Sequence, residues 1–316
     1  MPEIRDFFSQ FICFLFFFLH SGGRDRSLVA WESQTGNFLF AKRYCHGAEI
    51  TAVDIVSANH QGQVVITGSS DGTVKFWAAA DNNRENINPN ENMNHSNNNN
   101  RRWNNNRNPN NNNNNTNRNN RNDYGYPWLA QTSLINDRIW SLAANPISDQ
   151  VVVGSAGLGG IPALHMIDMA TNELIPMGQG LKKGAGTLDL SWHTEQTFLS
   201  CGHDTSARLW DTRTGTCVRN WEEPFDDAIY CIHTDNRMTL LCGTARHGLV
   251  RLWDMRLKQP VSYFHAKHPH HKSSPVYSIA ADHSNLYVAQ DQSLNLISFA
   301  GTRAANHNKH NRNQMK

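Results

Sequence analysis

The chain has 316 residues, a formal net charge of +2 and a mean hydropathy of −0.59, and a long central stretch of it is almost pure asparagine. The foldable remainder is enough for one large β domain with a sizeable core, so the length does not require two domains. The near-neutral charge indicates no particular class of partner. Six cysteines show neither a Cys-x-x-Cys pair nor the His/Cys spacing of a zinc site, which suits reduced, buried thiols in the cytoplasm or the nucleus.

Residues 1–20 form an apolar leader. Its core, Phe11–Leu19, has nine residues, far fewer than the roughly 20 that a membrane-spanning helix needs. A signal peptide is one reading, although Glu3 and Asp6 oppose the usual positive start and no Ala-x-Ala site follows. The reading we favour is a mis-set gene start, because a translated intron pyrimidine tract would give such a Phe-rich run.

The next segment, 21–80, begins with a fragment of a repeat and continues with a complete one. The fragment has a turn at Gly22–Asp25, a strand at Ser27–Trp31 and an outer strand at Gly36–Ala41, and we expect its first two strands to be absent. The complete repeat opens at His46-Gly47. Alternation and β-branched residues predict its strands at Ile50–Ile55, Gln63–Thr67 and Thr73–Trp77.

Residues 81–123 are dominated by asparagine with scattered arginine. The segment has too few apolar residues to offset the entropy of ordering the chain, so we predict a disordered surface insertion between two repeats. No platform of aromatic side chains for stacking on bases accompanies the arginines, so they give little support for nucleic-acid binding.

Four further repeats follow over residues 124–302, and 303–316 is a polar tail. We expect their three strands, repeat by repeat, at Arg138–Leu142, Val151–Gly154 and Ala163–Asp168; Thr187–Ser191, Phe198–Gly202 and Ser206–Trp210; Ala228–His233, Thr239–Gly243 and Leu249–Trp253; and Val276–Ala280, Leu286–Ala289 and Leu294–Phe299.

The repeats share a register in which an apolar residue, usually Trp, follows a turn residue after six positions. The pairs are Asp25 and Trp31, Asp71 and Trp77, Asp204 and Trp210, His247 and Trp253, and Asp291 and Ile297. A period of roughly 40–45 residues with such turns is typical of WD repeats, four strands to a blade. We therefore predict an all-β WD-repeat β-propeller with five complete blades and a partial one. Its first blade would lack two strands, and its last blade would lack the outer strand that closes the ring.

His46, Thr67, Asp71 and Trp77 stand where WD-repeat proteins keep a buried hydrogen-bonded tetrad. In it, Asp accepts from His, His meets the hydroxyl, and the hydroxyl reaches the indole N–H. Although His, Asp and Thr also make up nucleophilic triads, the Trp and the period favour a structural lock. We expect no catalytic residue, no cofactor and no metal ion, and we therefore predict a non-catalytic binding protein.

A partner would bind at one mouth of the central channel. The residues placed there by register are Thr51, Trp140, Leu188, Tyr230 and Tyr277. Trp and Tyr are common interface anchors because they bury large area and keep a polar tip. The alternative is that these side chains only plug the channel.

Three other patterns have structural readings. Lys75, Arg208 and Arg251 lie two positions before a Trp, where packing is favoured over phosphate recognition. The Gly-rich stretch Gly154–Gly160 runs from strand to strand without a helix N-terminus to hold phosphate. A cluster at His265, His268, His270 and His271 has no Cys or carboxylate partner nearby in sequence, so we expect no metal site there.

From Ser21 to about Phe299, outside the asparagine tract, the chain resembles F-box/WD-repeat proteins. The resemblance rests on segments that the general repeat does not explain: Asp137–Ser141, Gly184–Asp189, Leu199–Thr205, Trp221–Pro224 and Ser274–Tyr277. It implies a seven-bladed ring that binds the protein to be ubiquitinated, within a Skp–cullin–F-box ubiquitin ligase. The chain shows no F-box, so we expect an N-terminally truncated relative. A Skp-type adaptor and a cullin would be partners only of a full-length product that carries one. We expect no membrane partner. The alternative is a generic WD-repeat scaffold without a link to ubiquitin.

Overall fold

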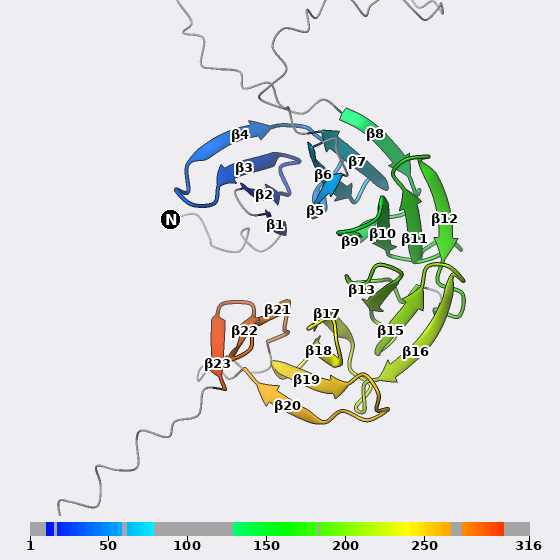
Figure 1. Ribbon diagram of the computed structural model, residues 1–316, viewed down its shortest axis with the longest axis vertical. Helices are drawn as coiled ribbons and strands as arrows, with labels where there is room; N and C mark the ends of the chain where they lie inside the picture. The colour runs from blue at the N-terminus through cyan, green and yellow to red at the C-terminus, as the bar shows by residue number, and fades with distance from the viewer. Residues whose placement is uncertain are drawn as a thin grey trace, which may run out of the picture.

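The computed structural model describes residues 11–15, 18–58, 62–78, 129–182, 184–266 and 274–299. Within these ranges all regular structure is β-strand, and the 23 strands form six antiparallel sheets arranged around a common centre (Figure 1). The prediction of an all-β propeller is confirmed. None of the described residues forms a helix that could cross a membrane.

Five of the six blades have four strands. Blade 1 contains β1 (Phe11–Leu15), β2 (Phe18–Gly22), β3 (Leu28–Glu32) and β4 (Phe38–Lys42), and blade 2 contains β5 (Ile50–Ala58), β6 (Gly62–Ser69), β7 (Thr73–Ala78) and β8 (Leu129–Leu134). Blade 3 contains β9 (Ile139–Ala144), β10 (Gln150–Ser155), β11 (Leu164–Asp168) and β12 (Glu173–Met177), and blade 4 contains β13 (Asp189–Thr194), β14 (Thr197–Cys201), β15 (Ser206–Asp211) and β16 (Thr216–Glu222). Blade 5 contains β17 (Ile229–Thr234), β18 (Thr239–Thr244), β19 (Leu249–Asp254) and β20 (Ser262–His265), whereas blade 6 has only β21 (Ser278–Ala281), β22 (Asn285–Ala289) and β23 (Leu294–Ser298).

The partial blade is the last one, which corrects the sequence prediction for blade 1. The apolar leader supplies the two strands that we expected to be absent: β1 pairs with β2, and β2 pairs with β3 from Phe18 opposite Glu32 to Gly22 opposite Leu28. A Phe-rich run has high strand propensity, and β3 offers it a free edge. The ring therefore has six blades, five of four strands and one of three, in place of five complete blades and a fragment.

The position of the asparagine-rich segment also differs from the prediction. Strand β8 pairs with β7, with Thr73 opposite Leu134, and so completes blade 2. The insertion therefore falls between the third and fourth strands of one blade, where we had placed it between two blades. Residues 79–128, which include the whole asparagine-rich segment, lie outside the described residues, as does the polar tail. The disorder of these segments therefore stays a prediction.

Packing between neighbouring blades makes up the core. The repeat Trp of a blade faces the preceding blade: Trp77 packs with Leu28, and Trp253 packs with Leu199. Residues one and three places before the Trp face the following blade, as Phe76 does. Burying an aromatic side chain in this way contributes roughly 2–3 kcal/mol. Each blade is thus held on two faces by alternate residues of the same strand.

Blade 6 departs from this arrangement on one face. Leu294 and Leu296 are 74% and 59% exposed, although their counterparts in blade 2, Val74 and Phe76, are 0% and 2% exposed. The innermost strands of successive blades pack side by side, but no comparable contact joins β21 to β1 within the described part of the chain, and the ring is open there (Figure 1). Among the described residues, nothing covers the outer edge of β23.

A buried Trp in blade 5 lacks the hydrogen bond that its counterparts make. In the register of the sheets, Thr67, Ser200 and Cys242 are equivalent, each opposite the basic residue two places before a Trp. Trp77 and Trp210 donate to the hydroxyls at 2.9 and 2.8 Å, whereas the Nε1 of Trp253 has no partner among the described residues. The thiol of Cys242 therefore replaces the expected acceptor.

We predict that Cys242→Ser stabilises the protein by about 1 kcal/mol, because the new hydroxyl accepts the orphaned indole N–H. The free energy of unfolding, measured by urea denaturation, checks this. Cys201→Ser is the matched control: Cys201 is buried in the same core but has no orphaned donor to satisfy, so this change should destabilise the protein. Equal effects of the two changes would contradict the assignment.

Candidate functional site

The structure brings the four tetrad residues together and differs from the expected pattern in one link. Trp77 Nε1 donates to Thr67 Oγ1 at 2.9 Å, and Thr67 Oγ1 lies 2.7 Å from His46 Nε2. The other ring nitrogen of His46 lies 2.8 Å from Thr73 Oγ1, which in turn donates to Asp71 at 2.6 Å. His46 itself is 3.7 Å from the carboxylate. Thr73, which we did not predict, therefore relays the contact.

The direction of these bonds assigns the tautomer of His46. Because Thr73 donates to Asp71, its oxygen must accept from Nδ1–H of His46, and Nε2 is left to accept from the hydroxyl of Thr67. Burial lowers the pKa of His46 to about 4, although Asp71 opposes the shift. The imidazole of His46 is therefore neutral at pH 7, and each polar group of the network has a hydrogen-bond partner. The arrangement is that of a structural lock.

The three basic residues that precede the repeat tryptophans are occupied within the fold. Lys75 Nζ donates to the carbonyl of Cys45 at 2.6 Å, and Arg208 pairs with Asp204 at 2.5 Å. Arg251 is buried and pairs with Glu223 at 2.8 Å. These contacts leave none of the three free to bind a phosphorylated segment.

Glu223 explains the unusual segment Trp221–Pro224. One carboxylate oxygen pairs with Arg251, and the other accepts the backbone N–H groups of Phe225 and Asp227 at 2.7 and 3.1 Å. The indole of Trp221 is buried and donates to the carbonyl of Leu257. The segment thus fixes the loop that leads from blade 4 into blade 5.

The Gly-rich loop wraps around an anion that belongs to the chain itself. The carboxylate of Asp137 accepts the N–H groups of Gly157 and Leu158 at 2.6 and 3.2 Å. A concave run of backbone N–H groups suits an anion, and Asp137 already fills it, which agrees with our rejection of a phosphate site. No group of metal-binding side chains occurs in the described ranges, and of the predicted histidine cluster only His265 falls within them.

An aromatic row runs across four neighbouring blades. Trp140 meets His203 edge-on with ring centroids 5.8 Å apart, and His203 meets Tyr230 in the same way at 5.7 Å. Tyr230 lies 6.0 Å from Tyr277, which is 48% exposed. Three of the five predicted rim residues therefore stand in one row. We call these four residues the aromatic row.

The other two predicted rim residues lie outside the row. The hydroxyl of Thr51 donates to the carbonyl of Ile139 at 2.7 Å, with the carbonyl of Gly68 at 3.2 Å, and so ties blade 2 to blade 3. Leu188 is half-buried, and its N–H donates to the carbonyl of Cys201. The sequence analysis missed His203, which links Trp140 to Tyr230. Its place in the turn just before the buried Asp204 was the available signal, because such a turn between strands lies next to neighbouring repeats.

Glycine makes room for the aromatic row. Gly186 has a φ of 65°, and a Cβ atom there would lie 2.1 Å from Cζ3 of Trp140. The indole therefore lies directly against the backbone of the loop that enters blade 4. This contact explains why glycine occupies position 186 in the Gly184–Asp189 segment.

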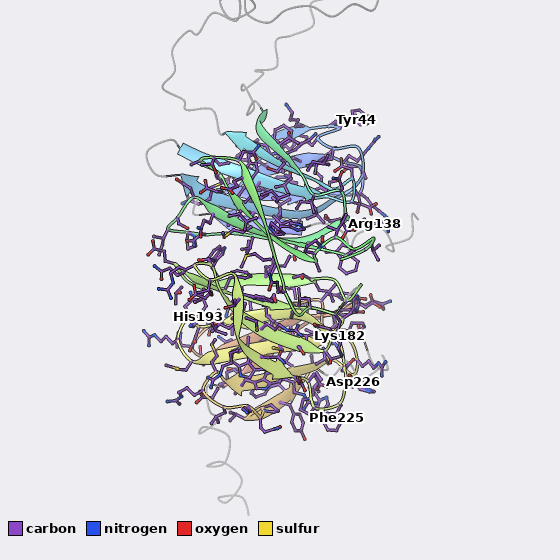
Figure 2. All side chains as sticks on the ribbon, turned by 90° about the vertical axis from the view of Figure 1, so that its right-hand side faces the viewer. Tyr44, Arg138, Lys182, His193, Phe225 and Asp226 are labelled. Atoms are coloured by element: carbon purple, nitrogen blue, oxygen red, sulfur yellow. The ribbon has the colours of Figure 1, made fainter. Side chains whose placement is uncertain are left out.

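Beside the aromatic row lies a pocket of about 690 Å³ between blades 4 and 5. Its wall includes His203 and Tyr230 from the row, with Lys182, Arg246 and Asp226 from three separate loops. Figure 2 shows Arg138, Lys182 and Asp226 along one face of the disc, with His193 on the other side. Two of the segments that distinguish the chain from a general repeat, Gly184–Asp189 and Leu199–Thr205, contribute residues to this pocket.

Comparison with known proteins agrees with the propeller fold. The WD domain, G-beta repeat model matches residues 38–78 and 183–211. The chain folds as a β-propeller, and two of its segments match the WD repeat. It resembles F-box/WD repeat-containing protein 4 of Mus musculus, with 39% identity over 166 residues, and the Homo sapiens protein, with 37% identity. Each of these matches covers 52% of this chain and 40% of the relative, so less than half of each relative's length is matched. The predicted resemblance to F-box/WD-repeat proteins is confirmed.

A more distant match is the THO complex subunit 6 homolog of Danio rerio, 30% identical over 143 residues, which covers 42% of each chain. Among solved structures, the computationally designed Ika8 protein matches 92% of this chain with a TM-score of 0.59 and 18% identity. Raptor of Chaetomium thermophilum matches 94% of it with a TM-score of 0.62 and 14% identity. At such identities these structures support the fold alone.

Proposed function

We propose that this chain is a protein-interaction propeller that binds a protein through the aromatic row, as the substrate-recognition part of a Skp–cullin–F-box ubiquitin ligase receptor. The observation that carries the binding role is the row itself, Trp140–His203–Tyr230–Tyr277, beside a pocket to which two of the distinguishing segments contribute. The resemblance to F-box/WD repeat-containing protein 4 supports the ligase role. The one candidate triad, His46, Asp71 and Thr67, is engaged in the structural tetrad, which supports a non-catalytic binding role.

A generic WD-repeat scaffold without a link to ubiquitin is the second candidate. The match to a THO complex subunit 6 homolog supports it, because that relative is named as part of a different complex. Co-purification of a Skp-type adaptor with the full-length gene product separates the two candidates. Adaptor in stoichiometric amount supports the ligase role, and its absence supports the scaffold.

We predict that replacing Trp140, Tyr230 and Tyr277 together by Ala lowers partner capture by at least about 100-fold, because truncating three interface anchors removes on the order of 1–2 kcal/mol each. Capture from lysate by the purified chain, followed by quantitative mass spectrometry, measures this. His193→Ala, on the other side of the disc, is the control (Figure 2). Loss of folding with no separable loss of capture would mean that the three rings only plug the channel.

A further inference from the structure

The pocket beside the aromatic row carries unpaired charges of both signs. Lys182 is exposed, and its ammonium group has no hydrogen-bond or ion-pair partner in the described part of the chain. The guanidinium of Arg246 is 71% exposed and reaches Asp227 only at 3.7 Å. The carboxylate of Asp226 is likewise exposed and has no hydrogen bond or ion pair among the described residues.

The remaining acidic groups of the pocket are already used by the fold. Asp204 is buried and pairs with Arg208. Asp227 is buried and accepts the backbone N–H of Arg246, so it positions this arginine at the rim. The charges that remain available to a ligand are therefore two cations and one anion.

The loop that carries Asp226 is built to hold it outward. Asp226 has a φ of 56°, a strained value for a residue other than glycine, and the buried carboxylate of Glu223 accepts the N–H groups on both sides of it. Asp226 therefore faces solvent from a turn whose conformation is fixed. Its charge is in position before a ligand binds, which reduces the cost of ordering the site on binding.

We propose that this pocket binds an extended, unphosphorylated peptide segment in which an acidic and a basic side chain lie close together. This inference rests on the proposed function. The acidic side chain of the peptide pairs with Lys182 and Arg246, and the basic one pairs with Asp226, while aromatic side chains next to them lie on Tyr230 and His203. A segment of one charge sign would leave either the cations or Asp226 facing a like charge, and such juxtaposition disfavours the wrong partner.

Fluorescence anisotropy with the full chain and labelled peptides tests the inference. The probes are GYEGKYG, its both-acidic form GYEGEYG, its both-basic form GYKGKYG, and a form of the first with phosphoserine in place of Glu. The wild-type protein should bind the mixed-charge peptide about tenfold more tightly than the both-acidic or both-basic forms. Asp226→Lys should make the both-acidic peptide the tightest, and Lys182→Glu combined with Arg246→Glu should make the both-basic peptide the tightest.

A change of preference requires a folded protein, so these outcomes do not depend on loss of binding. The same ranking of peptides in wild type and charge variants would overturn the inference, as would tightest binding of the phosphoserine peptide or no binding of any probe. Tyr230→Ala should weaken all four peptides to a similar extent. If the aromatic variants lose partner capture but the charge variants keep the wild-type preference, this inference fails and the proposed function stands.

Discussion

Glu223→Ala should destabilise the protein by about 3–5 kcal/mol, the largest effect that we expect from a single substitution. Removing the carboxylate leaves the guanidinium of Arg251, 7% exposed, without its buried partner, and removing one member of such a pair typically costs this much. The N–H groups of Phe225 and Asp227 lose their acceptor as well. Urea denaturation followed by Trp fluorescence measures the free energy of unfolding.

The neighbouring Glu222 gives a matched control. Its side chain is exposed and accepts only a 3.3 Å contact from Asn220. Glu222→Ala removes the same atoms one position away and should change the free energy of unfolding by less than about 0.5 kcal/mol. If both substitutions cost the same, Glu223 does not anchor the loop. A loss in Glu223→Gln near that of Glu223→Ala would locate the effect in the charge, because the amide still accepts hydrogen bonds.

The protein should lose stability in mild acid. Burial lowers the pKa of His46 and of His20 to about 4, whereas an unfolded His titrates near 6.5. Between pH 6.5 and 4 the unfolded chain therefore binds more protons than the folded chain, and the free energy of unfolding falls as the pH falls. From pH 7.5 to pH 5, His46 alone should account for about 2 kcal/mol.

One buried acid acts in the opposite direction. Asp189 accepts the N–H groups of Leu190 and Ile232, and burial raises its pKa to about 6, so its ionisation costs stability above about pH 4 and that cost decreases on acidification. It offsets part of the loss from the two histidines. Urea titrations at pH 7.5, 6 and 5 on wild type and His46→Gln isolate the His46 contribution. A variant with the same pH dependence as wild type would show that His46 is not buried in its neutral form.

The sequence was sufficient for the propeller because the Asp-to-Trp register repeats with little variation, and the strands predicted around Trp77, Trp210 and Trp253 are those of the structure. It was misleading in blade 1 and at the outer strand of blade 2. The leader Phe11–Leu19 lacks the turn signals of a repeat, and its strands are defined only by the pairing of β1 with β2 and of β2 with β3. The outer strand β8 lies more than 50 residues after β7 in sequence, so only spatial pairing assigns it to blade 2.

The candidate site could likewise be predicted only in part, because repeat positions follow from the sequence and contacts between loops of different blades do not. Register placed Trp140, Tyr230 and Tyr277 at one mouth of the channel, because residues at equivalent positions in successive blades lie side by side. It did not indicate that His203, from a different strand pair, stands between two of them, or that the hydroxyl of Thr51 is consumed by carbonyls of two blades. Such contacts depend on how loops from separate blades meet, and no repeat position encodes that.

The central claim, that the aromatic row is the partner-binding face, is tested most directly by site-specific photo-crosslinking. The full-length gene product would carry p-benzoylphenylalanine in place of Tyr230 in one variant and of His193, on the other side of the disc, in a second (Figure 2). After irradiation in cells, our account predicts a crosslink between position 230 and a captured protein, with position 193 giving none to the same protein. Crosslinks to that protein from position 193 and none from position 230 would contradict it.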